Sequence, residues 1–258
     1  MEKHFENPEA INSADRELID SLALELEIEP HRIAEIQSGM NNRLFVVETE
    51  NQKFLFKKYH KDERLRLKRE YEAFAFLRKN GFVNVPKPYV RNDELSAAVY
   101  SFEEGRSKVA GEVTRGDVDQ MLGFVCKLQS FKPAEVKQEF LPVVLACITL
   151  QDYIENINFR LGKFADVAKS SDAHPLIKEL IDSTGVIEYI SSHRDGLQKR
   201  VSESPDNENP DEAKRLSPGD FGLHNTIFKD DGTDMFIDFE YFGWEDPQAI
   251  VASFVNHD

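Results

Sequence analysis

Cysteine is nearly absent from this 258-residue sequence, which contains only Cys126 and Cys147. Both lie in apolar stretches without the paired spacing of a zinc or redox site, so neither a disulfide framework nor a cysteine metal site is indicated. We expect both to be buried, reduced thiols, because an unpaired cysteine behaves as a small hydrophobic residue. A chain of this length can form one sizeable domain or two modest ones without such cross-links.

Long apolar runs are also lacking. No segment approaches the roughly 18 apolar residues of a membrane-spanning helix, and the first residues contain no apolar run of signal-peptide length. We therefore expect a cytoplasmic protein with no membrane partner. Hydrophobic and charged contents of 40% and 31% are those of an ordinary soluble globular protein.

Basic residues are in deficit, and the formal net charge is -15. This charge argues against a nucleic-acid partner, because phosphate backbones are bound through an excess of lysine and arginine. An acidic surface is how many cytosolic proteins stay soluble, and it favours a cationic small-molecule ligand only slightly.

The first 102 residues predict a sheet-rich lobe of α+β type. Apolar residues at helical spacing, after a capping serine at Ser13, predict an amphipathic helix, and a second stripe predicts a long helix that ends at Asn80-Gly81. Alternating patterns predict five strands, the first three antiparallel. The expected helices are 13–26 and 62–80, and the expected strands are 33–36, 43–49, 53–59, 89–91 and 97–102.

Residues 103–258 predict a second, mostly helical lobe. Residues 103–107 have the composition of a linker, and residues 203–212 combine acidic residues with two prolines, which is typical of a mobile surface loop. Near the end, two short apolar strands flank a turn at 230–232. The expected helices are 113–131, 150–169 and 175–199, and the expected hairpin strands are 226–229 and 235–237.

This hairpin joins two loops that carry oxygen ligands. Asp220 and Asn225 are separated by four residues, and the return strand delivers Asp238 beside them. One carboxylate that orients a hydroxyl, with an amide and a second carboxylate that hold Mg²⁺, is what phosphoryl transfer requires. The alternative is that all three are turn-capping residues, which are common in loops. We predict Asp220 as the catalytic residue and Asn225 and Asp238 as metal ligands.

Three further polar residues lie near this trio. Glu240 could be another metal ligand, although a structural or substrate-facing role is at least as well supported, and Asp246 is a second nearby acid. His224 adjoins Asn225, but a loop histidine near a turn is more often a hydrogen-bonded spacer, so we assign it no chemistry.

A cation for the phosphates has a candidate in Lys57, on the third expected strand. Strand alternation turns Lys58 to the opposite face. Glu70, on the following helix, could hold the Lys57 ammonium, whereas Glu72 lies about 200° around that helix. Residues 38–42 include a glycine between two strands, where backbone amides can turn toward an anion. Each feature alone is more often a solvated side chain or a plain turn; their order along the chain carries the prediction.

These motifs resemble the aminoglycoside phosphotransferase and choline kinase family, whose fold is similar to that of protein kinases. Residues 38–42 are similar to its glycine and asparagine loop, residues 54–57 to its strand lysine, residues 69–71 to its helix glutamate, and residues 219–225 and 237–241 to its catalytic and metal motifs. The resemblance implies a two-lobed kinase-like fold and ATP and Mg²⁺ as cofactors. It also implies that nucleotide is bound by Gly39, Asn42, Lys57, Glu70, Ser101, Phe102 and Glu103, the last three through the hinge.

Two departures from the family pattern stand out. Pro218 and Gly222 occupy positions where the family usually has histidine, and the chain stops at Asp258, where family members run on through helices that often shape the acceptor pocket. The prediction is an ATP-dependent kinase for a hydroxyl of a sugar, amino alcohol or aminoglycoside-like molecule. The alternative is a catalytically silent nucleotide-binding or scaffold protein of the same shape. The acceptor itself cannot be read from these motifs.

Overall fold

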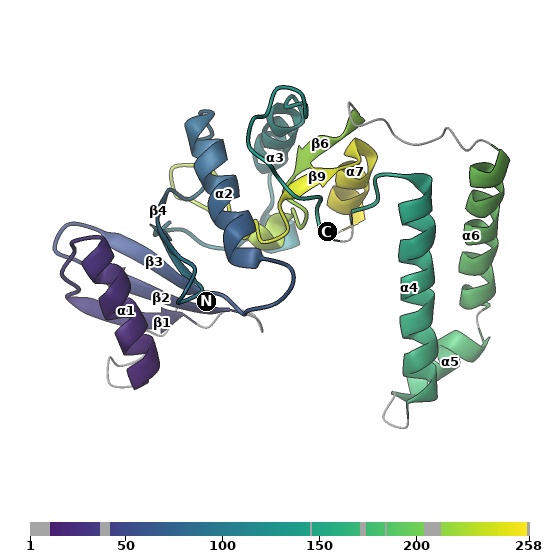
Figure 1. Cartoon of the computed structure of the whole chain (residues 1–258), viewed down its shortest axis with the longest axis horizontal. Helices are drawn as coiled ribbons and strands as arrows, with labels where there is room; N and C mark the ends of the chain where they lie inside the picture. The colour runs from purple at the N-terminus through teal and green to yellow at the C-terminus, as the bar shows by residue number, and fades with distance from the viewer. Residues whose placement is uncertain are drawn as a thin grey trace.

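The first half of the chain folds into a five-stranded antiparallel sheet flanked by two helices (Figure 1). The computed structural model describes residues 11–36, 42–144, 146–170, 174–183, 185–203 and 213–256. The strand order is β1-β2-β3-β5-β4. In chain order the elements are α1 (Ser13–Glu25), β1 (Arg32–Ile36), β2 (Arg43–Glu48), β3 (Lys53–Lys58), α2 (Arg66–Lys79), β4 (Pro88–Asn92) and β5 (Ala97–Ser101).

Strand alternation gives the sheet two different faces. Phe54 and Phe56 of β3 pack with α1, in a cluster that also includes Phe45 of β2. Leu55 and Lys57 alternate with these residues and so point to the other face, where α2 packs. The predicted sheet is confirmed, and its geometry aims Lys57 at α2 rather than at solvent.

Two helix starts differ from the sequence prediction. Asn12, not Ser13, caps α1, since its side chain accepts a hydrogen bond from the Asp15 N–H at 2.9 Å. The second helix was expected to begin at Asp62 but begins at Arg66. The reason is Leu65, whose φ of 56° lies in the left-handed region and prevents the helix from extending backward.

The second half is mostly helical, as predicted. Residues 175–199 were expected as one helix but form two, which separate around Gly185, a glycine with a φ of 64°. The expected loop at 203–212 begins within the last turn of α6, and residues 204–212 lie outside the described residues. The helices are α3 (Arg115–Leu128), α4 (Leu150–Lys169), α5 (Pro175–Ser183), α6 (Val186–Glu203) and α7 (Pro247–Asn256).

Two small antiparallel pairs carry the segment predicted to be catalytic, residues 215–245; its loops at 218–225 and 237–242 are called the catalytic loops below. β6 (Arg215–Ser217) pairs with β9 (Gly243–Glu245), and β7 (Thr226–Phe228) pairs with β8 (Asp234–Phe236). Single 3₁₀ turns lie at Ala110–Glu112 and Leu223–Asn225. The predicted hairpin is therefore present, and residues 218–225 and 237–242 are the loops that it and the outer pair bring together.

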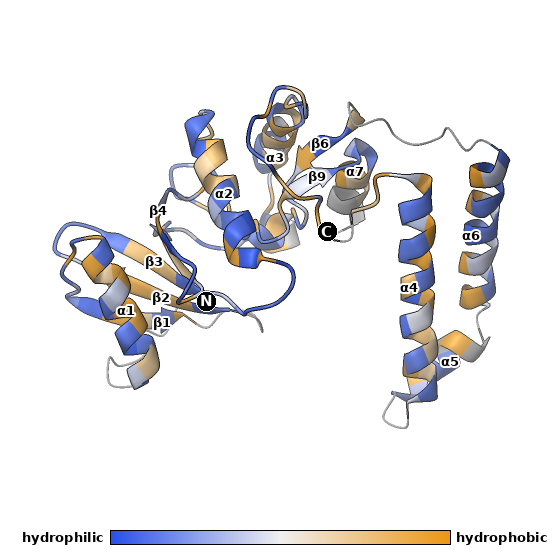
Figure 2. Ribbon diagram, viewed as in Figure 1, coloured by the Kyte–Doolittle hydropathy of each residue, from blue (hydrophilic) through white to orange (hydrophobic). Residues whose placement is uncertain are grey.

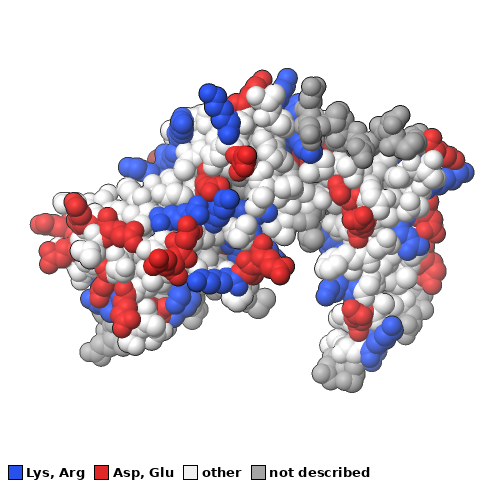
Figure 3. Space-filling model, viewed as in Figure 1, with Lys and Arg blue, Asp and Glu red and all other residues white. Residues whose placement is uncertain are grey.

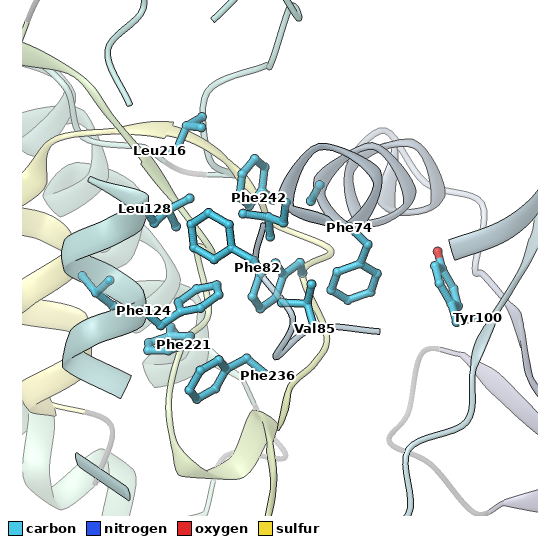
Figure 4. Packing of buried hydrophobic residues seen from close by; sticks show 14 of the residues in the cluster. Phe74, Phe82, Val85, Tyr100, Phe124, Leu128, Leu216, Phe221, Phe236 and Phe242 are labelled. Atoms are coloured by element: carbon cyan, nitrogen blue, oxygen red, sulfur yellow. The ribbon is translucent and has the colours of Figure 1, made fainter. Parts of the chain in front are cut away.

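An aromatic core holds this segment against α2 and α3. Phe124 of α3 stacks on Phe221 at 5.5 Å between ring centroids and lies 4.7 Å from Phe236. Phe74 of α2 lies 5.2 Å from Phe239. Figure 4 shows Phe74, Phe124, Phe221 and Phe236 among the side chains of this core. Because the same cluster contains Tyr100 of β5, the sheet and the catalytic loops share one core.

Helices α4, α5 and α6 stand apart from this core (Figure 1). Ile154 is the one buried side chain of α4 among the described residues, whereas Phe159, Leu176 and Tyr189 on the three helices are 52%, 66% and 66% exposed. Figure 2 shows the apolar residues distributed along these helices. Near the start of α4, the Tyr153 hydroxyl donates to Asp246 at 3.3 Å and joins the helix to the loop before α7.

One prediction about the cysteines is wrong. Cys147 is buried, but Cys126 is exposed on α3, because Phe124, Val125 and Leu128 form the inward stripe of that helix.

The surface in view mixes acidic and basic side chains, with no large patch of one sign (Figure 3). Within the described residues, no helix has both the length and the apolar character needed to cross a membrane.

Asp234, in the hairpin, is buried at a cost in stability. It is 1% exposed, and its Oδ2 has no hydrogen-bond partner among the described residues. Burial, with Asp117 nearby, raises its pKa to about 6 from an ordinary value near 3.8. The folded protein therefore binds the proton more tightly than the unfolded chain, so stability should fall as the pH rises from about 4 to about 6.

We expect Asp234→Asn to raise Tm at pH 7.5 by about 2–4 °C, the shift that about 1 kcal/mol produces in a chain of this size. The gain should shrink below pH 4, where the wild-type carboxyl is protonated. Thermal unfolding across this pH range measures both effects. Asp231→Asn is the control, since that exposed carboxylate accepts the Thr233 N–H and its replacement should not raise Tm. A lower Tm for Asp234→Asn would contradict the argument.

Candidate active site

A cavity of about 500 Å³ opens between the sheet and the catalytic loops. Its walls come from β2, β3, β5, α2 and the segment around Asp220 and Asp238. Eight of the site residues predicted from the sequence line it, and so do the nearby Glu240 and His224. The eight are Asn42, Lys57, Glu70, Ser101, Phe102, Glu103, Asp220 and Asp238. The fold thus brings together residues that lie up to two hundred positions apart.

Lys57 is the centre of an ion cluster. Its Nζ lies 2.7 Å from Glu70 Oε2, 2.9 Å from Asp238 Oδ1 and 2.8 Å from Glu240 Oε1. The predicted contact between Lys57 and Glu70 is present, because both side chains project between β3 and α2. Lys58 instead binds Asp15, and Glu72 binds Arg91, as expected for residues that face away.

Burial and charge set the protonation of this cluster. Burial alone would lower the pKa of Lys57, but Glu70, Asp238 and Glu240 raise it well above its ordinary value. Burial would likewise raise the pKa of Asp238, but Lys57 lowers it below its ordinary value. Asp238 is therefore ionised at neutral pH beside a protonated lysine, which are the charge states that a metal ligand and a phosphate-binding cation require.

Behind the cluster, Tyr59 holds Glu70, and Tyr100 contacts Tyr59. The Tyr59 hydroxyl donates to Glu70 Oε2 at 2.5 Å, and it lies 2.7 Å from the Tyr100 hydroxyl. Burial raises the pKa of both hydroxyls well above the ordinary value, so both remain protonated. Sequence analysis did not identify either tyrosine. An aromatic residue in a strand is usually read as core, and only the fold shows that the Tyr59 hydroxyl reaches a buried carboxylate and the Tyr100 hydroxyl reaches Tyr59.

Asp220 lines the cavity from a loop with close backbone packing. Gly219, with a φ of 84°, precedes it, and a Cβ there would lie 2.5 Å from the Tyr241 Cβ. The Asp220 loop therefore packs closely against Tyr241, where position 219 has no room for a side chain. His224 Nε2 lies 3.1 Å from Asp220 Oδ1, a contact that sequence analysis did not predict because it treated His224 as a spacer.

Asp238 and Asn225 are joined through the backbone. The Ile237 N–H donates to the Asn225 carbonyl at 2.9 Å, which places Asp238 directly after a residue paired with Asn225. The Asn225 amide donates to the Asp220 carbonyl at 3.0 Å. Asn225 is 8% exposed and, unlike Asp238, is not among the described residues that line the cavity. In this structure its side-chain nitrogen therefore braces the Asp220 loop, which leaves the side-chain oxygen as its candidate metal ligand.

The acidic groups have the chemistry of a magnesium site. Carboxylate oxygens of Glu70, Asp238 and Glu240 lie within 4.8 Å of one another. Hard oxygen donors on a few carboxylates, completed by water and phosphate oxygens, suit Mg²⁺. The donor set fits the ion, with the Lys57 ammonium as the cation that balances these charges here.

Glu240 makes more contacts within the site than its position in the sequence indicated. Besides Lys57, its carboxylate accepts hydrogen bonds from the Asn42 amide and from Arg66 Nη1, the latter at 2.6 Å. Arg66 was not identified from the sequence, where the available signal was its position one helical turn before Glu70. Asp246 has a structural contact instead, since its Oδ1 accepts the Gln248 N–H at 2.9 Å in the first turn of α7.

The hinge residues Ser101, Phe102 and Glu103 also line the cavity. The N–H groups of Ser101 and Phe102 donate to Lys87 and Lys53 carbonyls. The Glu103 carboxylate accepts from the Ser101 hydroxyl at 2.6 Å and from Lys229 Nζ at 2.7 Å, which ties the hinge to the hairpin. Among predicted site residues, Gly39 lies outside the described residues, so the covering loop is seen only from Asn42 onward.

A two-lobed, protein-kinase-like fold with a lysine, a helix glutamate and paired catalytic loops around one cavity defines a phosphoryl-transfer enzyme. The family model described as "Phosphotransferase enzyme family" matches residues 32–257. The chain belongs to this family. No curated protein sequence matches the chain.

Solved structures show the same fold at low sequence identity. The aminoglycoside phosphotransferase APH(2'')-Ib with ADP bound is 18% identical, with a TM-score of 0.58 over 90% of this chain and 73% of that one. Choline kinase LicA from Streptococcus pneumoniae is 19% identical, with a TM-score of 0.56 over 93% and 74%. Spectinomycin phosphotransferase APH(9)-Ia, with ADP and its antibiotic, has a TM-score of 0.62 at 13% identity, over 90% and 70%.

Proposed function

We propose that this protein transfers the γ-phosphoryl group of ATP to a hydroxyl of a small polar molecule. The observation that carries the proposal is the cluster in which Lys57 meets Glu70 and Asp238 at 2.7 and 2.9 Å, in a cavity that Asp220 also lines. A strand cation, a helix carboxylate and two loop carboxylates are the parts that phosphoryl transfer needs from a protein.

Each residue then has a definite task. Lys57, oriented by Glu70, binds the phosphates, and Asp220 accepts a hydrogen bond from the acceptor hydroxyl and aligns it for attack. Asp238 and Asn225 would hold Mg²⁺, with Glu240 as a further oxygen ligand. When bound, Mg²⁺ neutralises the phosphate charge that develops during transfer.

The hinge would receive the adenine ring. The Glu103 N–H has no hydrogen-bond partner among the described residues, whereas the N–H groups of Ser101 and Phe102 are used within the sheet. Glu103 is therefore our candidate backbone donor to the base. We place the boundary between the nucleotide lobe, residues 1–102, and the catalytic lobe, residues 103–258, at this hinge. The cytoplasm, where ATP is abundant, is the proposed location.

The acceptor that we propose is a hydroxylated, cationic small molecule. The named neighbours act on or bind aminoglycosides, spectinomycin and choline, which are hydroxylated and cationic. An amino alcohol or aminoglycoside-like acceptor agrees with the net charge of -15.

The test combines binding with turnover. The protein is mixed with ATP, Mg²⁺ and a panel of aminoglycosides, amino alcohols and sugars, and ADP release and phosphorylated product are measured. Acceptor-dependent ADP release is the expected result. A thermal shift with Mg²⁺ and ATP but no turnover with any acceptor would instead favour a silent nucleotide-binding protein. The absence of both binding and turnover would contradict the proposal.

A further inference from the structure

Arg66 is a buried arginine to which the proposed reaction gives no task. Its side chain is 5% exposed, and its guanidinium has three neighbours. Nη1 lies 2.6 Å from Glu240 Oε2, Nε lies 3.0 Å from Asp62 Oδ2, and the guanidinium carbon lies 5.5 Å from the centre of the Tyr241 ring. A buried guanidinium is stable only when its partners satisfy it, so these contacts fix the side chain in one orientation.

The Glu240 carboxylate divides its two oxygens between different parts of the site. Oε2 binds Arg66, while Oε1 lies 2.8 Å from Lys57 Nζ and accepts from the Asn42 amide. Glu240 is two residues from Asp238, on the same short segment. By fixing the orientation of Glu240, Arg66 therefore also restrains the segment that carries Asp238. Through Asn42, it restrains the end of the loop before β2.

Helix α2 thus makes two ion pairs from one face. Arg66 and Glu70 are four residues apart, so their side chains lie on the same side of the helix. Glu70 holds Lys57 on β3, and Arg66 holds Glu240 on the catalytic segment. One face of α2 consequently contacts both the sheet lysine and the segment that carries Asp238.

A charge argument shows why the second pair matters during the reaction. Lys57 here balances three carboxylates, and phosphate oxygens would compete with them for its ammonium. Once Lys57 turns to phosphate, Arg66 is the cation that remains against Glu240 among the described residues. Without it, Oε2 of a carboxylate that is 4% exposed would lose its cationic side-chain partner, whether or not Mg²⁺ binds the other oxygen, and such a loss is unfavourable for a buried carboxylate.

We propose that Arg66 is a positioning residue: by holding Glu240, it fixes the segment that carries Asp238 against α2 and Lys57. The inference rests on the proposed function for its kinetic consequence alone. Its structural consequence belongs to the nucleotide-free protein and can be measured there.

The structural test is hydrogen exchange of the nucleotide-free protein. In Arg66→Gln, amides of residues 66–70 and 237–241 should exchange about tenfold faster, because both ends of the contact are released together. Glu240→Gln should accelerate the same two segments. Arg64→Gln is the matched control. Arg64 lies two residues before Arg66 and contacts the Tyr241 hydroxyl at 3.0 Å. Among the described contacts it has no ion pair with Glu240. Faster exchange confined to residues 66–70, or spread evenly over the protein, would overturn the proposal.

The kinetic test separates positioning from stability. Per folded molecule, Arg66→Gln should lower kcat about tenfold and change KM for MgATP less than about threefold, since misplaced groups act mainly in the transition state. The double variant with Glu240→Gln should be no slower than Glu240→Gln alone, because the two residues act as one unit. Additive losses would overturn the proposal. Arg66→Lys, which keeps the charge, should recover part of the exchange protection and supplies the test if Arg66→Gln does not fold.

The exchange and kinetic tests distinguish failure of the proposed function from failure of the proposed role of Arg66. If the wild-type protein transfers phosphate to no acceptor, the proposed function fails while the exchange result still decides the role of Arg66. If transfer occurs but residues 237–241 exchange normally in Arg66→Gln, the role of Arg66 fails while the proposed function stands.

Discussion

The Asp220→Asn protein should bind nucleotide normally but transfer phosphate about 10²–10⁴ times more slowly than the wild-type protein, the usual range for removal of a positioned proton acceptor. Asparagine has nearly the same shape as aspartate, so the close packing of Gly219 on Tyr241 should be preserved. What is lost is the negative oxygen that accepts the acceptor hydroxyl proton and orients the hydroxyl toward the phosphate.

The measurement is the initial rate of acceptor-dependent ADP release, paired with a titration of ADP in the presence of Mg²⁺. Asp230→Asn is the control for the loss of one charge. Asp230 is an exposed aspartate in the turn of the hairpin that follows Asp220, and its replacement should leave the rate unchanged. A rate within about threefold of wild-type for Asp220→Asn would remove Asp220 from its catalytic role.

Strand and helix periodicity correctly predicted which side chains of β3 and α2 face each other. Alternation along β3 separates Lys57 from Lys58, and 100° per residue along α2 separates Glu70 from Glu72. In the structure, Lys57 and Glu70 meet at 2.7 Å, whereas Lys58 and Glu72 pair with Asp15 and Arg91. These predictions succeed because the direction of a side chain is a local property once the element is known.

Contacts between distant segments could not be predicted in this way. Arg66 and Glu240 are 174 positions apart, and nothing near either residue in the sequence indicates that they meet. The pairing of Tyr59 with Glu70 and Tyr100 is hidden for a related reason: the same residue type also serves as ordinary core. The pattern that placed Lys57 and Glu70 therefore does not show what braces them.

The start of α2 illustrates how one backbone angle changes a site. The expected helix from Asp62 would have placed residues 62–65 in helical turns. Because Leu65 has a left-handed conformation instead, the helix begins at Arg66. Asp62 lies outside the helix, and its carboxylate accepts a hydrogen bond from Arg66 Nε at 3.0 Å. A leucine with positive φ has no sequence signature, so the cap of the helix that carries Glu70 was predicted at the wrong residue.

The second large effect is expected for Asp238→Asn, which should abolish the Mg²⁺ dependence of nucleotide binding and reduce transfer by about 10²–10³-fold, the range for loss of one strong electrostatic contact to the transition state. Asp238 has a φ of 65°, and asparagine tolerates this left-handed conformation as well as aspartate does. The substitution therefore removes the charge while leaving the loop in place, which alanine would not do.

The decisive comparison is ADP affinity with and without Mg²⁺, measured by calorimetry in the wild-type and variant proteins. Mg²⁺ should tighten binding to the wild-type protein and have little effect on Asp238→Asn. The variant lacks the ionised carboxylate oxygen that Lys57 holds in place and that Mg²⁺ needs as a ligand. Glu72→Gln, whose carboxylate pairs with Arg91 outside the cavity, should respond to Mg²⁺ as the wild-type protein does. If Asp238→Asn retains the full response, the metal site must instead be built on Glu70 and Glu240, the other two carboxylates of the cluster.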